Sequence, residues 1–137
     1  MTLRAILAGT GSALPRTRVS NAELAARVDT SDEWIVERTG IRFRHIAEPD
    51  ETTTTLGADA AKQALTAAGL EPADIGLIIV ATATHDNTFP ASATKVQALL
   101  GIPDCIAFDV AAAARASFMR YRSPTRCSAP APRSMRW

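Results

Sequence analysis

The segment Ile75-Gly76-Leu77-Ile78-Ile79-Val80-Ala81 decides the fold class of this chain. An unbroken apolar run of strand length is typical of a strand covered on both faces, as in a parallel sheet between helices. A helix is expected from about Ala91 to Leu100, closed by Gly101, and residues 105–110 predict the next strand. Strand, helix and strand with short connections form a βαβ unit, so the sequence predicts the α/β class.

Two short helices are predicted upstream of this unit. Ser20 followed by Glu23 is a capping box, which indicates a helix over residues 22–28. A second short helix begins at Thr30 or Ser31, since either hydroxyl can accept a hydrogen bond from the first helical turn. Both helices lie in the first third of the chain.

Glycines mark the remaining boundaries. Gly40 ends the second short helix, and a longer helix is expected over residues 56–68. Residues 3–9 predict a strand that runs into a glycine loop. We interpret Gly9 and Gly11 as a tight turn that only glycine tolerates, because their spacing is not that of a phosphate-binding fingerprint.

Composition fits a soluble globular protein, with 47% hydrophobic and 21% charged residues and a net charge of +1. No apolar run reaches membrane-spanning length and no signal peptide is recognisable, so a cytoplasmic protein is expected. Cys105 and Cys127 have no metal-binding or disulfide spacing. The charge is unevenly distributed: residues 1–113 carry nine Lys/Arg and fourteen Asp/Glu, whereas residues 114–137 carry six Arg and no acid.

Three motifs together resemble one enzyme family, that of the β-ketoacyl-acyl-carrier-protein synthases III. The first is Asp29–Arg42 (DTSDEWIVERTGIR), the second is Gly76–Thr84 followed by Phe89–Ala93, and the third is Ala107–Ala113 (AFDVAAA). The resemblance runs in the family's order from Gly9 to Ala113. Any one of these pieces is weak support, but their joint order is specific.

The resemblance implies a thiolase-like α/β fold, of which residues 1–113 form the N-terminal part of the first βαβ-containing half. It also implies a decarboxylating condensation of acyl-CoA, such as acetyl-CoA, with malonyl-acyl carrier protein, which initiates fatty-acid biosynthesis. Coenzyme A enters as a thioester substrate, and no tightly bound cofactor or metal is expected. Family members form homodimers, and neither nucleic acid nor a membrane is an expected partner.

Four residues take roles from the resemblance. Trp34 matches the tryptophan that stacks on the adenine of coenzyme A, Arg38 matches a contact to a coenzyme phosphate or to the carrier protein, and Thr30 is a nearby polar contact. Phe89 matches a phenylalanine at the acyl pocket and dimer interface. Each also has a purely structural alternative: Trp34 as a helix anchor, Arg38 in a surface ion pair, Thr30 as a helix cap and Phe89 as core.

Other reactive residue types receive no functional role. His45 follows a matching stretch, but the family's catalytic histidine and asparagine lie far downstream, beyond the end of this chain. His85 and Asp86 predict a solvated turn. Cys105 precedes its strand and is interpreted as a small buried hydrophobe instead of a nucleophile.

The chain departs from the family at Ala114, where the family has its nucleophilic cysteine. One choice of codons for residues 113–129, read one base out of phase, spells Cys-Ala-Gly-Phe-Ile-His-Ala-Leu-Ser-Val-Ala-Asp-Ala-Leu-Leu-Arg, which resembles the family's continuation. We therefore hypothesise a frameshift after Ala113. Residues 114–137 are then an out-of-frame, disordered basic tail, and the chain is inactive because alanine offers no thiolate.

Three alternatives remain open. The chain is a non-catalytic CoA-binding or interaction module derived from the family, or it belongs to a related branch that makes polyketides or hydroxymethylglutaryl-CoA. The segment 29–34 favours the fatty-acid branch. A nucleic-acid-binding role for the basic tail is the weakest alternative, because the tail has little aromatic interleaving.

Overall fold

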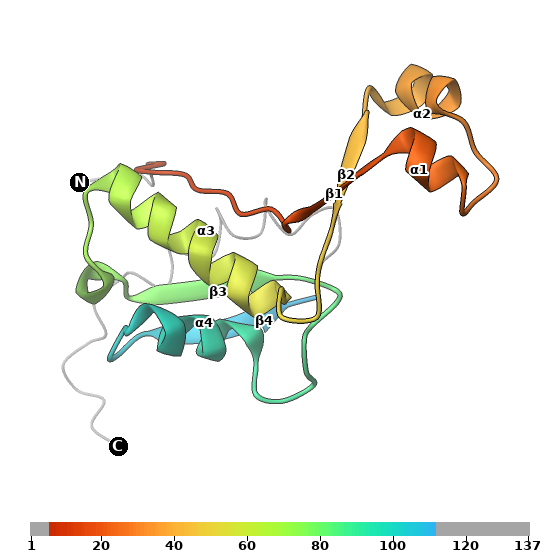
Figure 1. Ribbon diagram of the computed structural model, residues 1–137. Helices are drawn as coiled ribbons and strands as arrows, with labels where there is room; N and C mark the ends of the chain where they lie inside the picture. The colour runs from red at the N-terminus through yellow and green to blue at the C-terminus, as the bar shows by residue number, and fades with distance from the viewer. Residues whose placement is uncertain (1–5, 112–137) are drawn as a thin grey trace, which may run out of the picture. The chain divides into compact units, whose positions relative to one another are not determined.

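The computed structural model describes residues 6–111 (Figure 1). The predictions on Ala114 and on the tail 114–137 lie outside the described residues. The described chain forms two compact units: residues 13–52, and residues 6–12 together with 53–111. No helix within 6–111 has the length and apolar composition needed to cross a bilayer.

The second unit contains the predicted βαβ motif. Strands β3 (Leu77–Ala81) and β4 (Ile106–Val110) pair in parallel. Helix α4 (Ser92–Leu100) connects them and contacts both strands (Figure 1). The α/β class is confirmed. The residues of β3 are all half-buried in the described chain, so the expected cover on both faces of the strand is not present there.

Helix α3 (Thr53–Ala68) packs against α4 and begins three residues before the predicted start. The Asp86 carboxylate explains the difference, because it accepts hydrogen bonds from the backbone N–H of Thr53 at 2.8 Å and of Thr54 at 2.9 Å. A distant side chain therefore caps this helix. The prediction that Asp86 belongs to a solvated turn is wrong. A short 3-10 helix, η1 (Pro72–Asp74), follows Gly69.

Residues 6–11 adopt no strand, although a strand was predicted over 3–9. This segment lies directly on α3. A Cβ atom at Gly9 would lie 2.5 Å from the carbonyl oxygen of Ala64, and one at Gly11 would overlap that of Ala60. Neither glycine has a positive φ, so the tight-turn interpretation is wrong: glycine is required here by the close approach of two backbones.

The unit of residues 13–52 is built on an antiparallel strand pair that was not predicted, β1 (Thr17–Ser20) with β2 (Phe43–Ile46). The helices α1 (Asn21–Ala25) and α2 (Asp32–Thr39) lie between these strands in sequence.

The predicted capping box of α1 is confirmed. The Ser20 hydroxyl accepts from the Glu23 N–H at 3.2 Å, and the Glu23 carboxylate accepts from the Ser20 N–H at 2.8 Å. The Ser20 hydroxyl also lowers the pKa of the Glu23 carboxyl, and the Ser20 backbone N–H adds to the shift. Helix α1 ends at Ala25, three residues before the predicted end.

Candidate functional site

Helix α2 carries two of the predicted site residues, and local sequence defines both of its ends. The Ser31 hydroxyl accepts from the Trp34 N–H at 3.2 Å, so Ser31 is the cap and Thr30 is not. Gly40 ends the helix with a φ of 70°, in the left-handed region that favours glycine. Thr30 lies half-buried immediately before the cap, close in sequence to the helix that holds Trp34.

Trp34 and Arg38 lie one helical turn apart on the exposed side of α2. Trp34 is 54% exposed, whereas its neighbour Ile35 is only 3% exposed. Ile35 is therefore the helix anchor, and the anchor alternative for Trp34 is wrong. The Arg38 guanidinium carbon lies 4.9 Å from the centroid of the indole, a cation–π geometry. The helix thus presents an aromatic face and a fixed positive charge together.

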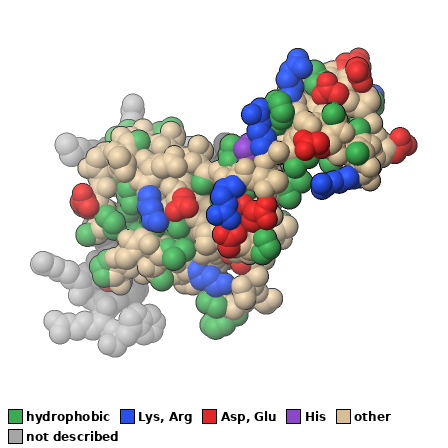
Figure 2. All heavy atoms as spheres, in the orientation of Figure 1, with side chains coloured by type: hydrophobic (Ala, Val, Ile, Leu, Met, Phe, Trp, Pro, Cys, Tyr) green, Lys and Arg blue, Asp and Glu red, His purple; other side chains and the backbone are tan. Residues whose placement is uncertain are grey.

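The rest of this unit has a mixed charged surface. Figure 2 shows acidic and basic side chains interspersed over the part that contains α1 and α2. Arg16 pairs with Asp50 at 2.8 Å and with Glu51 at 3.3 Å. A second cation–π contact places the Arg18 guanidinium 3.5 Å from the centroid of the Phe43 ring. The Arg16–Asp50 pair is exposed on both sides and contributes little to stability, whereas the Glu51 side chain is only 10% exposed.

Asn21 is a buried polar residue beneath α2 that sequence analysis missed. Its side-chain nitrogen donates to Asp32 Oδ1 and to the Ile41 carbonyl oxygen, both at 2.8 Å. Its side-chain oxygen accepts from Arg44 Nη1 at 2.9 Å. An asparagine at a helix start is usually interpreted as a local cap, so no sequence signal distinguishes this role.

Phe89 belongs to the other compact unit, in the connection between β3 and α4. It is 86% exposed, so the alternative that it is part of the core is wrong. Trp34 and Arg38 contact each other on α2, and Thr30 lies just before this helix in sequence, whereas Phe89 belongs to the other compact unit.

Two carboxylates near β3 and β4 accept hydrogen bonds from the first backbone N–H groups of a helix. Besides Asp86, Asp109 accepts from the backbone N–H of Ser92 at 2.7 Å and of Ala93 at 2.8 Å, and thereby caps α4. His85 Nδ1 lies 3.1 Å from Asp109 Oδ2. The residues His85 and Asp109 are thus structural partners, a pairing that the sequence did not predict.

Cys105 is half-buried just before β4. Loss of hydration and, secondarily, the charge of Asp104 raise the pKa of its thiol. A raised pKa reduces the thiolate fraction, which is the reactive form. A raised pKa and a half-buried position both disfavour Cys105 as a nucleophile. Nowhere in residues 6–111 do three His, Cys, Asp or Glu side chains gather in a way that suits a metal ion.

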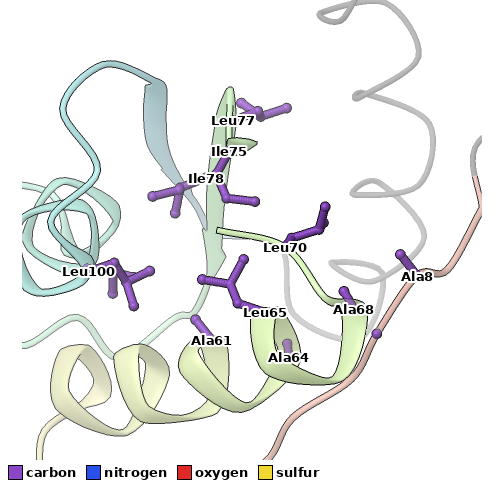
Figure 3. Close-up of a pocket in the computed structure, with 12 residues that line it drawn as sticks. Ala8, Ala61, Ala64, Leu65, Ala68, Leu70, Ile75, Leu77, Ile78 and Leu100 are labelled. Atoms are coloured by element: carbon purple, nitrogen blue, oxygen red, sulfur yellow. The ribbon is translucent and has the colours of Figure 1, made fainter. Parts of the chain in front are cut away.

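An apolar groove of about 300 Å³ lies between α3 and β3 (Figure 3). Leu65 and Ala61 of α3 point toward Ile78 of β3 and toward Leu100 at the end of α4. Ligand sites normally combine an apolar lining with a few polar groups that orient the ligand. Among the described residues, the lining of this groove has no polar side chain, which favours a packing surface. The described lining residues are Ala8, Gly9, Ala61, Ala64, Leu65, Ala68, Leu70, Ile75, Leu77, Ile78, Val96 and Leu100.

Two curated relatives of this chain have the same name. The chain is 91% identical over 112 residues to the beta-ketoacyl-acyl-carrier-protein synthase III of Sphingopyxis alaskensis, covering 82% of this chain and 35% of that protein. It is 71% identical over 109 residues to the enzyme of the same name from Rhizorhabdus wittichii, covering 80% and 34%. The chain therefore spans about a third of the length of these curated relatives. No family model matches it.

Solved structures show the same relationship. The 3-oxoacyl-acyl-carrier-protein synthase III of Aquifex aeolicus matches with a TM-score of 0.76 and 46% identity, over 81% of this chain and 36% of that one. The priming β-ketosynthase of the R1128 polyketide pathway matches with a TM-score of 0.73 and 38% identity, over 80% and 34%. The thiolase-like fold predicted from the sequence is confirmed for the matched part of the chain.

Proposed function

Because this chain belongs, over about four fifths of its length, to the β-ketoacyl-acyl-carrier-protein synthase III family, we propose that it derives from an acyl-condensing enzyme. The intact enzyme joins acyl-CoA to malonyl-acyl carrier protein with loss of carbon dioxide, and so initiates fatty-acid biosynthesis. The observation that carries this proposal is the 91% identity to a synthase III over 112 residues. A cytoplasmic homodimer is the expected state of the intact enzyme.

Within this chain, the proposed substrate contact is the exposed face of α2. The indole of Trp34 is a suitable platform for the adenine of coenzyme A, since a purine stacks well on an aromatic ring. Arg38 lies over one side of the ring, and the proposed position of the base is the other side. The same guanidinium is close enough to the ring to pair with a phosphate of a stacked nucleotide, and Thr30 supplies a further polar contact.

The first prediction concerns Trp34. Replacing Trp34 with alanine is expected to weaken coenzyme A binding by a factor of roughly 5 to 150, because stacking of one base contributes about 1–3 kcal/mol. Equilibrium dialysis of the full chain against coenzyme A measures the change. The control is Phe43→Ala, which removes the aromatic partner of Arg18 in the same unit. Equal losses in the two variants would contradict a stacking role for Trp34.

The chain itself is proposed to be catalytically inactive. By the resemblance, the family's nucleophilic cysteine corresponds to Ala114, which offers no thiolate. Cys105 offers no substitute, because its pKa is raised and it precedes β4. We attribute the departure at Ala114 to a frameshift after Ala113, which makes the basic residues 114–137 an out-of-frame product.

A second prediction tests the frameshift through mass. A chain of this sequence, 14.5 kDa in mass, is expected to keep that mass after incubation with acetyl-CoA, because Ala114 offers no thiolate to accept the acetyl group. Intact-mass spectrometry before and after the incubation measures the change. A protein from the native cells that carries the same N-terminal sequence and gains an acetyl group on a cysteine would show that the frame is intact and the parent synthase active.

A non-catalytic role is the second candidate function. The observation that favours it is that Trp34 and Arg38 lie in a compact unit, residues 13–52, that does not include position 114. Such a module binds coenzyme A without turnover. Binding in the absence of acetyl transfer by the 14.5-kDa chain is the result expected for this role.

A further inference from the structure

Asn21 is the first residue of α1, and only 1% of it is exposed. Both hydrogens of its amide nitrogen and its amide oxygen are used in hydrogen bonds. The nitrogen donates to Asp32 Oδ1 and to the Ile41 carbonyl oxygen, and the oxygen accepts from Arg44 Nη1. Its backbone N–H also donates to the Arg42 carbonyl oxygen at 3.3 Å. A buried amide with this many short contacts fixes its partners in place.

The partners of the amide nitrogen belong to the two ends of α2. Asp32 is the first residue of the helix, and Ile41 follows Gly40, whose left-handed conformation ends it. Since both acceptor oxygens bind one nitrogen, they must lie close to each other. A single side chain therefore bonds the Asp32 carboxylate at the start of α2 and the backbone just after its end. Arg44, which donates a hydrogen bond to the Asn21 amide oxygen, connects the same side chain to β2.

Helix α2 has eight residues, and a helix of that length does not maintain its orientation without tertiary contacts. Ile35 supplies the apolar contact, with 3% of the residue exposed. Asn21 supplies the polar contacts at the helix ends. Trp34 and Arg38 make no buried contact that would orient the helix, because both are exposed.

We infer that Asn21 is a positioning residue, which holds α2 so that Trp34 and Arg38 are presented together to the adenine and a phosphate of the coenzyme. The inference rests on the proposed function only for the identity of the ligand. The arrangement of Trp34 against Arg38 is a property of the chain itself and is measurable without any ligand.

The amide is the one side-chain group that meets this demand, because it offers two donors and one acceptor on a short stem. Leucine has a similar shape but no hydrogen-bonding atom, so Asn21→Leu leaves Asp32, Ile41 and Arg44 without their partner. Asn21→Ser is the milder variant, since a hydroxyl retains one donor. If the leucine variant does not fold, the serine variant provides the comparison.

The experiment uses the full chain with Trp137→Phe, which leaves Trp34 as the single tryptophan. Acrylamide quenching of Trp34 fluorescence reports the exposure of the indole ring, and its anisotropy reports the mobility of the ring. Equilibrium dialysis reports coenzyme A binding. Asn21→Leu is expected to change the Trp34 signals and to weaken coenzyme A binding about tenfold. This factor corresponds to the free energy of about one to two hydrogen bonds that no longer orient α2.

Two control variants separate positioning from general loosening. Val19→Ala creates a cavity in the same unit, where Val19 is 7% exposed in β1. Asn87→Leu removes an amide in the other unit, where its oxygen accepts from Lys95 Nζ at 2.9 Å. The variants are compared at urea concentrations at which their free energies of unfolding are equal. Neither control is expected to change the Trp34 signals.

Each outcome decides the inference. A change in Trp34 confined to the Asn21 variants supports it. Unchanged Trp34 signals in Asn21→Leu overturn it, as does an equal change in Val19→Ala at equal stability. If the unsubstituted chain binds no coenzyme A but only the Asn21 variants alter Trp34, the positioning role stands and the coenzyme proposal fails.

Discussion

Replacing Asp109 with asparagine is expected to lower the free energy of unfolding of the unit that contains β4 by about 2–3 kcal/mol. The carboxylate accepts from the backbone N–H groups of Ser92 and Ala93, and His85 Nδ1 lies 3.1 Å away. An asparagine side chain retains one acceptor and turns an N–H₂ group toward a donor. Because the Asp109 side chain is only 13% exposed, water does not replace the lost bond fully.

Urea unfolding followed by circular dichroism measures this effect. The matched control is Asp59→Asn, which makes the same chemical change on α3, where the carboxylate is 60% exposed and pairs with Lys62 at 3.2 Å. An exposed ion pair of this kind contributes little. Equal effects of the two substitutions would contradict the role assigned to Asp109 as the cap of α4.

A second large effect is expected at Gly11. Alanine at this position is expected to destabilise the packing of residues 6–12 on α3 by about 1–3 kcal/mol, because its methyl group would overlap the backbone of Ala60 and Ala64. Backbone atoms of a helix cannot move aside as a flexible side chain would. The segment must therefore lift from the helix, which raises hydrogen exchange and protease sensitivity in residues 6–12.

The matched control for this substitution is Gly76→Ala. A Cβ atom at Gly76 meets no atom within 4 Å, and its φ is not positive. The same methyl group is therefore tolerated just before β3. A comparable loss of stability at Gly76 would show that the effect at Gly11 arises from glycine removal in general and not from the close approach to α3.

Sequence patterns predicted the elements whose determinants are local. The apolar run 75–81 predicted β3, and the Ser20–Glu23 capping box predicted the start of α1. Gly40 and Gly101 end their helices in the left-handed conformation, as expected. In each case a few neighbouring residues contain the whole physical cause.

The elements that were missed depend on distant partners. β1 and β2 are four residues each, mostly exposed, and separated by two helices, so neither shows an alternating apolar pattern. The first turn of α3 requires Asp86, more than thirty residues downstream. The requirement for glycine at Gly9 arises from the backbone of Ala64, which local turn rules do not consider.

The candidate site was predictable in part. The motif at 29–42 identified Trp34 and Arg38 together, and helical spacing placed them one turn apart. Ser31, and not Thr30, proved to be the cap, a choice that two adjacent hydroxyls leave open in sequence. The contribution of Asn21 comes from three tertiary hydrogen bonds, so it appears only in the folded chain.

The parallel pair of β3 and β4 has a consequence for how molecules of this chain meet one another. Within residues 6–111 each strand has one neighbour, so the outer side of each carries backbone N–H and C=O groups that no further strand pairs. Such edges are templates for strand addition, and the apolar side chains of Leu77–Ala81 favour it. A strand of a second molecule that met one of these edges would extend the sheet from one molecule to the next, and an added charge at the edge would oppose it.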